Sequence, residues 1–166
     1  RLAALMDPGA PLVSNLANAA ALLYEELPRV NWAGFYLARG EELLLGPFGG
    51  NPACLRIPFG KGVCGTAAAR RETILVPDVH AFPGHITCDS ASRSEIVLPL
   101  IKNGRLFGVL DIDSPERGRF SEEDAAGFTE TARILASLPG WEGGRLLCKK
   151  TACPCKAKQG QAVCYF

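Results

Sequence analysis

The sequence predicts one α+β domain, in which a mostly antiparallel β-sheet carries the N- and C-terminal helices on one face and active-site loops on the other. Two observations predict these layers: apolar residues recur at helical spacing near both ends of the domain, and short β-prone runs lie between them. A third observation predicts the sheet direction. The runs are joined by short turns such as Asn103-Gly104, and such turns connect antiparallel neighbours.

Helices are predicted at both ends of the domain and once in its middle. Residues 12–27 have apolar side chains at helical spacing, and Pro28 ends the run. In the middle, a glycine turn leads into an alanine-rich helix that contains Cys64. The last helix begins after Ser121, which is a favourable N-cap with acidic residues in the turn that follows, and it ends before a Pro-Gly pair.

The strands are predicted from alternation and turn signals. Over residues 31–38 the alternation places Trp32 and Tyr36 on one face of a strand. GEELLLGPFGG then indicates a turn, a second strand and a glycine-rich loop, while CLRIPF and TILVPDV indicate short strands. EIVLPLI and RLFGVLDID form a predicted hairpin, whose second strand presents Asp111 and Asp113 on one face.

Composition limits the class of protein. A chain of 166 residues that is 48% hydrophobic can bury one core. Its longest apolar runs fall short of the roughly 20 residues that cross a bilayer, and no basic-then-apolar leader is visible, so we expect a cytoplasmic protein without a membrane partner. Five of the 18 basic residues lie from Arg145 onward, where no acid occurs. The residues before Arg145 therefore have a net charge of about −4. That charge argues against a nucleic-acid partner.

The composition changes after residue 140, so we expect a catalytic domain over residues 1–140 and a loosely ordered, Cys- and Lys-rich tail over residues 141–166. Four of the seven cysteines lie in that tail. Their C-x4-C-x-C-x8-C spacing could offer thiolates to zinc, but it lacks the paired C-x2-4-C knuckles of structural zinc sites. We therefore expect neither a metal nor an organic cofactor.

Residues 54–113 hold the side chains best suited to chemistry. They are three cysteines (Cys54, Cys64, Cys88), both histidines (His80, His85) and three carboxylates in or beside apolar runs (Glu95, Asp111, Asp113). Burying an unpaired carboxylate is costly and shifts its pKa, so packing alone explains these acids poorly. From the residues alone, Cys64 could equally be a small packed residue, Trp32 a core aromatic, and the two aspartates hydrogen-bonded strand ends.

Several motifs together resemble a known family. NWAGFYL, GKGVCGTAA, DVHAFPGHITCDSASRSEIVLPL and GVLDIDS occur here in the order found in the free methionine-(R)-sulfoxide reductases, which are built on a GAF domain. The similarity covers roughly residues 12–138 and does not extend into the tail. It implies a GAF-like fold and the reduction of free L-methionine (R)-S-oxide to L-methionine.

The resemblance also implies roles for individual residues. Cys88 matches the nucleophile, Cys54 the principal resolving thiol and Cys64 a secondary partner. The substrate-binding positions fall on Trp32, Tyr36, Glu95, Asp111 and Asp113. The family pattern gives neither histidine a part in the reaction.

The implied chemistry needs these residue types. Reducing a sulfoxide requires a soft nucleophile, which a thiolate supplies, and a proton for the departing oxygen. Clustered carboxyls in a poorly hydrated site cannot all ionise cheaply, so one of them would stay protonated and donate that proton. The thiol would become a sulfenic acid, a second thiol would close an intramolecular disulfide, and thioredoxin would restore both thiols.

Two other functions fit parts of the sequence. GAF-type domains also serve as sensory modules, which bind a small ligand without converting it. Alternatively, the cysteines could form a redox switch or metal module centred on the tail. The sequence leaves the oligomeric state open, and a homodimer formed through exposed helices is compatible with it.

Overall fold

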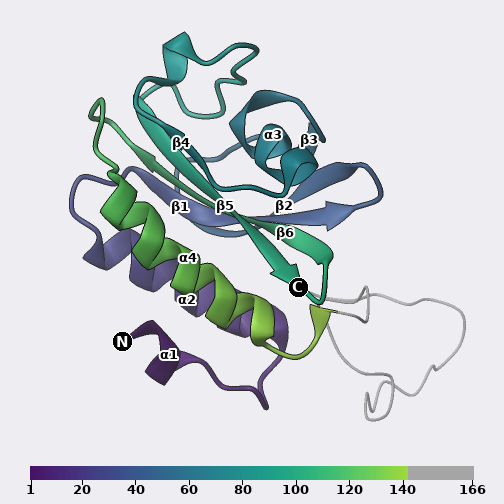
Figure 1. The fold of residues 1–166 in the computed structure, drawn as a ribbon. Coiled ribbons are helices and arrows are strands. Elements are labelled where there is room, and N and C mark those ends of the chain that lie inside the picture. The colour runs from purple at the N-terminus through teal and green to yellow at the C-terminus, as the bar shows by residue number, and fades with distance from the viewer. Residues whose placement is uncertain (142–166) are drawn as a thin grey trace, which may run out of the picture.

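The computed structural model describes residues 1–141, and an antiparallel sheet of six strands lies at its centre (Figure 1). The strand order is β3-β2-β1-β6-β5-β4, and each neighbouring pair is antiparallel. The strands are β1 (Trp32–Arg39), β2 (Glu42–Gly50), β3 (Arg56–Pro58), β4 (Ile74–Val76), β5 (Ser94–Lys102) and β6 (Arg105–Ser114). The predicted α+β class is thus confirmed. Residues 142–166 of the predicted tail lie outside the described residues, so a domain boundary at residue 140 stays a prediction.

Helices cover both faces of the sheet. Helices α2 (Leu12–Glu26) and α4 (Glu122–Ser137) lie on one face, where α4 contacts β5 and α2 contacts β1 and β2 (Figure 1). Helix α3 (Gly62–Arg70) packs on the other face, beside irregular segments and the 3-10 turn η1 (Val79–Ala81). The active-site loops were expected on that face, and α3 also buries an apolar side there. A short helix, α1 (Leu2–Leu5), contacts α2.

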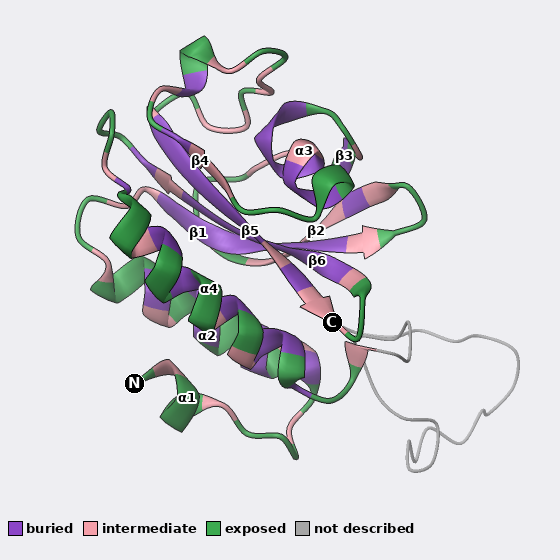
Figure 2. Ribbon diagram, viewed as in Figure 1, coloured by how far each residue is buried: buried purple, intermediate pink, exposed green. Residues whose placement is uncertain are grey.

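Buried residues, in purple, run along the central strands and occur on the helices (Figure 2). Alternation along the strands separates two apolar clusters, one on each face of the sheet. In β1, Ala33 and Phe35 pack with α2 and α4, whereas Trp32 and Tyr36 pack with α3. This is the division that the sequence pattern predicted, because successive side chains of a strand point to opposite faces. Among the residues that the structure describes, no helix is both long enough and apolar enough to cross a membrane.

Local signals set the boundaries of the last elements. Asn103 and Gly104 both have positive φ, at 51° and 72°, as the turn of a two-residue hairpin between β5 and β6 requires. Ser121 caps α4 by accepting a hydrogen bond from the Asp124 backbone N–H, and the Asp124 carboxylate accepts one from the Ser121 backbone N–H. The predicted hairpin and the predicted N-cap are both confirmed.

Strand β2 is longer than its sequence suggested. We expected a glycine-rich loop at GGNP, residues 49–52, but β2 continues to Gly50, which pairs with Trp32. A Cβ on Gly50 would lie 2.7 Å from the Asn31 carbonyl oxygen, so the absence of a side chain permits this close pairing. Gly50 is explained by the close approach of two strands and does not indicate a turn.

Candidate active site

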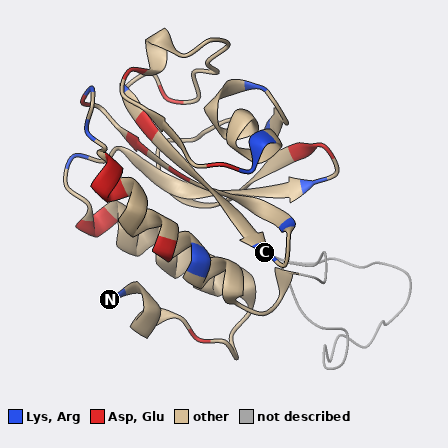
Figure 3. Ribbon diagram, in the orientation of Figure 1, with Lys and Arg blue, Asp and Glu red and all other residues tan. Residues whose placement is uncertain are grey.

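Strand register brings three carboxyl side chains together on the α3 face of the sheet. Asp111 and Asp113 are two residues apart on β6 and therefore point to the same face. Glu95 of β5 pairs with Asp113 across the ladder, and paired residues share a face. Figure 3 shows acidic positions, in red, within the sheet as well as on the helices.

A small cavity lies beside these carboxyls. It is lined by Glu95, Asp111, Asp113, Cys64 and Cys88, and also by His85 and Asp89. The space that the centre of a water molecule can reach inside it is about 30 Å³. Five of the eight site residues predicted from the sequence therefore line one cavity.

The acidic cluster holds protons unusually tightly. Burial, followed by the charge of Asp111, raises the pKa of Glu95 well above its ordinary value, and the same two causes raise the pKa of Asp113. Burial raises the pKa of Asp111 only to about 6, because side-chain hydrogen bonds from Cys64 and Glu95 favour its ionised form. Asp111 is therefore the first of these carboxyls to ionise, and its charge makes Glu95 hold its proton more tightly.

Cys64 contributes a buried thiol to the same cluster. Its Sγ donates to Oε1 of Glu95 over 3.7 Å, and burial, followed by the charge of Asp111, raises the pKa of the thiol. The thiol stays protonated at neutral pH and is a poor nucleophile. Donor atoms of Cys64, Glu95 and Asp111 lie within 4.8 Å of one another and could hold a metal ion. A cation would first have to displace the hydrogen bonds that join them.

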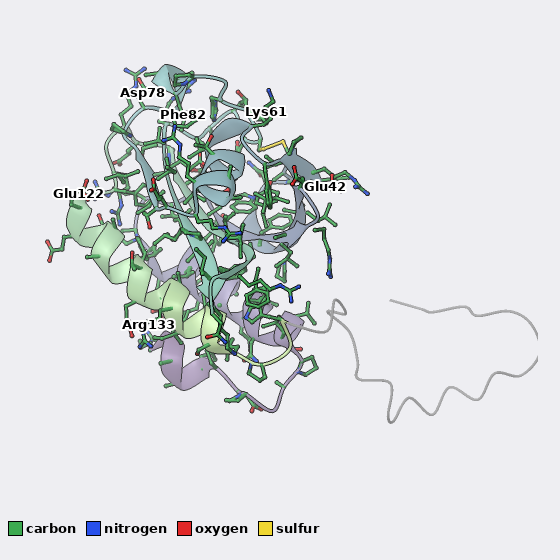
Figure 4. The ribbon with its side chains drawn as sticks, turned by 45° about the vertical axis from the view of Figure 1, so that its right-hand side comes forward. Glu42, Lys61, Asp78, Phe82, Glu122 and Arg133 are labelled. Atoms are coloured by element: carbon green, nitrogen blue, oxygen red, sulfur yellow. A yellow bond between two sulfur atoms is a disulfide. The ribbon has the colours of Figure 1, made fainter. Side chains whose placement is uncertain are left out.

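Cys54 and Cys88 form a disulfide across two loops, with Cα atoms 5.4 Å apart (Figure 4). Cys54 lies in the segment between β2 and β3, and Cys88 lies between η1 and β5. Both residues are partly exposed, so a reductant can reach the bond from solvent. Cys88 also lines the cavity, whereas Cys54 lies outside its lining.

Aromatic side chains of β1 lie beside the acidic cluster. Trp32 stacks on Tyr36 and on Phe48, with ring centroids 5.8 Å and 5.3 Å apart. A Cβ on Gly34 would lie 2.4 Å from the Cβ of Phe48, so this stack depends on glycine. The Tyr36 hydroxyl and Oδ1 of Asp111 are buried and have no hydrogen-bond partner among the described residues. Neither Trp32 nor Tyr36 lines the small cavity itself.

Two further residues of the loop around Cys88 line the cavity. His85, to which the family pattern gives no part in the reaction, is one of them, and burial together with His80 lowers its pKa. Asp89 was not singled out, although its carboxylate joins several segments. The available signal was its position, because an acid that directly follows a candidate nucleophile belongs to the same loop.

Comparisons with known proteins agree with this geometry. The GAF domain model matches residues 11–138. Free methionine-R-sulfoxide reductase from Escherichia coli is 55% identical over 135 residues, which are 81% of this chain and 82% of that protein. The chain belongs to the GAF-domain free methionine-R-sulfoxide reductase family.

Solved structures are also similar to this GAF domain. A free methionine-R-sulfoxide reductase from Neisseria meningitidis, crystallised in complex with its substrate, is 48% identical with a TM-score of 0.77, and the match covers 81% of each chain. A protein from Burkholderia vietnamiensis described as a putative GAF sensor is 53% identical with a TM-score of 0.76, covering 82% of this chain and 85% of that one. The sensory function and the reductase function thus both occur among the names of similar proteins.

Proposed function

We propose that the chain is a cytoplasmic oxidoreductase that reduces free L-methionine (R)-S-oxide to L-methionine and is recycled by thioredoxin. One observation supports this function above the sensory alternative. Cys88 lines a cavity with three buried carboxyls and is at the same time bonded to Cys54 in a partly exposed disulfide. A ligand sensor needs neither a reducible disulfide nor a cluster of protonated acids.

In the first step, the Cys88 thiolate attacks the sulfoxide sulfur, and a carboxyl of the cluster protonates the oxygen. Glu95 is suited to donate, because its pKa is raised by burial and by Asp111. The sulfoxide gains two electrons and leaves as methionine, while Cys88 becomes a sulfenic acid. Cys64 is a poor alternative nucleophile, since burial raises the pKa of its thiol.

In the second step, the Cys54 thiol attacks the sulfenic acid, so that a disulfide forms and the oxygen leaves as water. Reduction by a dithiol such as thioredoxin restores both thiols. Cys64 is then a secondary partner at most, because it is buried and unbonded.

The acidic cluster and the aromatic residues beside it select the substrate. Ionised Asp111, with Asp113 beside it, attracts the ammonium group of a free amino acid, which a residue inside a polypeptide lacks. Trp32 and Tyr36 provide an apolar surface next to the cluster, and the unpartnered Tyr36 hydroxyl offers a hydrogen bond to a polar substrate group. Enclosure by these groups favours a small free substrate over a protein.

The test is a coupled assay with thioredoxin, its reductase, NADPH and separated epimers of free methionine sulfoxide. The protein should consume NADPH with the R epimer and not with the S epimer, and Cys88→Ser should abolish turnover. Full turnover by Cys88→Ser would contradict the mechanism. Saturable binding of the unchanged ligand, without turnover and without dependence on the cysteines, would instead establish the sensory function.

A further inference from the structure

The carboxylate of Asp89 joins three segments of the chain. Its Oδ2 accepts hydrogen bonds from Nδ2 of Asn31 over 3.1 Å and from Nδ2 of Asn51 over 3.2 Å. Its Oδ1 accepts from the Ala91 backbone N–H over 2.9 Å, which closes a turn within the Cys88 loop. The residue directly after the nucleophilic cysteine is therefore held by that loop, by the start of β1 and by the end of β2.

The contact between Asn51 and Asp89 bridges the two cysteine loops. Asn51 lies three residues before Cys54, and Asp89 lies one residue after Cys88. The Asn51 carbonyl oxygen also accepts a hydrogen bond from Nε1 of Trp32 over 3.1 Å, which fixes this part of the Cys54 loop against β1. The bridge thus connects the Cys88 loop to a loop that is itself anchored on the sheet.

From this geometry we infer that Asp89 is a positioning residue that holds the Cys88 loop against the Cys54 loop while the two sulfurs are not bonded. In the disulfide form the covalent bond itself keeps the loops together. Once the disulfide is reduced, the contacts of Asp89 keep the two sulfurs within reach of each other. The inferred role in turnover depends on the proposed reductase function, whereas the effect on disulfide formation can be measured without it.

The chemistry explains why such a residue matters. When the sulfenic acid of Cys88 condenses with the thiol of Cys54, an S–S bond forms, the S–O bond breaks and water leaves. The rate depends on how often the two sulfurs meet, so a contact that holds the loops together raises their effective concentration. The Ala91 N–H, Asn31 and Asn51 stabilise the ionised form of Asp89 and lower its pKa, so these hydrogen bonds are charge-assisted at neutral pH.

The first experiment needs no substrate. The wild-type protein and Asp89→Ala are equilibrated in glutathione buffers of graded redox state, and the Cys54–Cys88 disulfide is quantified by alkylation and mass spectrometry. Loss of two charge-assisted contacts between segments should lower the equilibrium constant for disulfide formation by roughly tenfold. An equilibrium constant for Asp89→Ala equal to the wild-type value would overturn the inference.

The second experiment follows one turnover. Reduced protein is mixed with a stoichiometric amount of free methionine (R)-sulfoxide, and released methionine, disulfide and dimedone-trapped sulfenic acid are measured over time. For Asp89→Ala we expect disulfide closure roughly tenfold slower than in the wild type, a smaller effect on methionine release, and more trapped sulfenic acid. Equal slowing of both steps would indicate general damage and overturn the positioning role. If the wild-type protein releases no methionine, the proposed function fails, while the glutathione equilibrium still decides the role of Asp89.

Two further variants separate the bridge from local loop structure. Asn51→Ala removes the donor from the exposed side of the bridge, so it should shift the glutathione equilibrium in the same direction as Asp89→Ala. In the double variant, the equilibrium should shift little further than in Asp89→Ala alone. Asp78→Ala is the matched control, because Oδ1 of Asp78 makes the same local turn with the His80 backbone N–H over 3.1 Å, while its other partners, the His80 ring and Arg117, do not belong to the Cys54 loop. Asp78→Ala should leave the equilibrium unchanged, and an effect equal to that of Asp89→Ala would refute the bridge.

Discussion

The substitution Asp111→Asn tests the electrostatic state of the acidic cluster. Burial raises the pKa of Asp111 from 3.8 to about 6. A carboxyl with a higher pKa in the folded chain than in the unfolded chain binds its proton more tightly when folded. Its contribution to stability is therefore complete below the unfolded pKa and is lost as the pH rises through about 6. At about 1.4 kcal/mol per unit, a shift of this size lowers the free energy of unfolding by about 3 kcal/mol once Asp111 is ionised in both states.

The measurement is urea unfolding of the disulfide form at several pH values. Asparagine has the shape of aspartate and cannot ionise, so Asp111→Asn should be more stable than wild type by about 3 kcal/mol near pH 8. The difference should shrink toward zero near pH 4, where Asp111 is protonated in the folded protein. Turnover should fall in the same variant, because the charge that attracts the substrate ammonium is gone.

A surface carboxylate provides a control of opposite sign. Burial opposes the ionisation of Asp124, but hydrogen bonds from Ser121 and the nearby Arg119 outweigh it and lower its pKa. Such a group stabilises the fold above its unfolded pKa and loses that effect as the pH falls. Asp124→Asn should therefore be less stable than wild type at neutral pH, and its free energy of unfolding should approach the wild-type value in acid.

If the stability difference for Asp111→Asn is the same at pH 4 and pH 8, our account of the cluster is refuted.

Three other substitutions probe the site and its support. Cys64→Ala should retain turnover and form the Cys54–Cys88 disulfide after one cycle, as mass mapping can establish, because Cys64 is buried and unbonded. Tyr36→Phe should raise the free energy of unfolding by about 1 kcal/mol, since it removes a buried hydroxyl without a described partner, but it should raise KM for the sulfoxide. Gly65→Ala should destabilise the fold by about 1–3 kcal/mol in urea unfolding, because its Cβ would lie 2.3 Å from the Pro58 carbonyl oxygen.

The elements predicted correctly from the sequence are those with strong local signals. Helix α4 has an N-cap at Ser121, the hairpin has Asn103-Gly104, and β1 is a β-prone run whose successive side chains pack on opposite faces of the sheet. Each of these signals acts within a few residues, so the sequence is sufficient to locate it. The end of β2 was not predicted, because its pairing depends on a partner strand that local composition does not describe.

The site was harder to predict, because distant segments form it. The pairing of Cys54 with Cys88 entered only through the family resemblance, since spacing alone cannot decide which loops meet. The bridge from Asn51 to Asp89 joins two polar residues in separate loops, and neither has a periodic pattern that would mark it. The cluster was more accessible, because an acid within an apolar strand such as β5 conflicts with packing and thereby attracts attention.

Strand register links the stability of this fold to its chemistry. In β5 and β6, Ile96 and Ile112 pair and face the core of α2 and α4, while Glu95 and Asp113 pair one position away and face the cavity. A slip of one residue would turn these acids into the helix core and the isoleucines toward the cavity, so burial of the apolar face selects the register that assembles the site. The large apolar cluster beneath the helices thus offsets the cost of burying the acids on the other face. For this reason, we expect the sheet to tolerate neutral replacements in the cluster that abolish its chemistry.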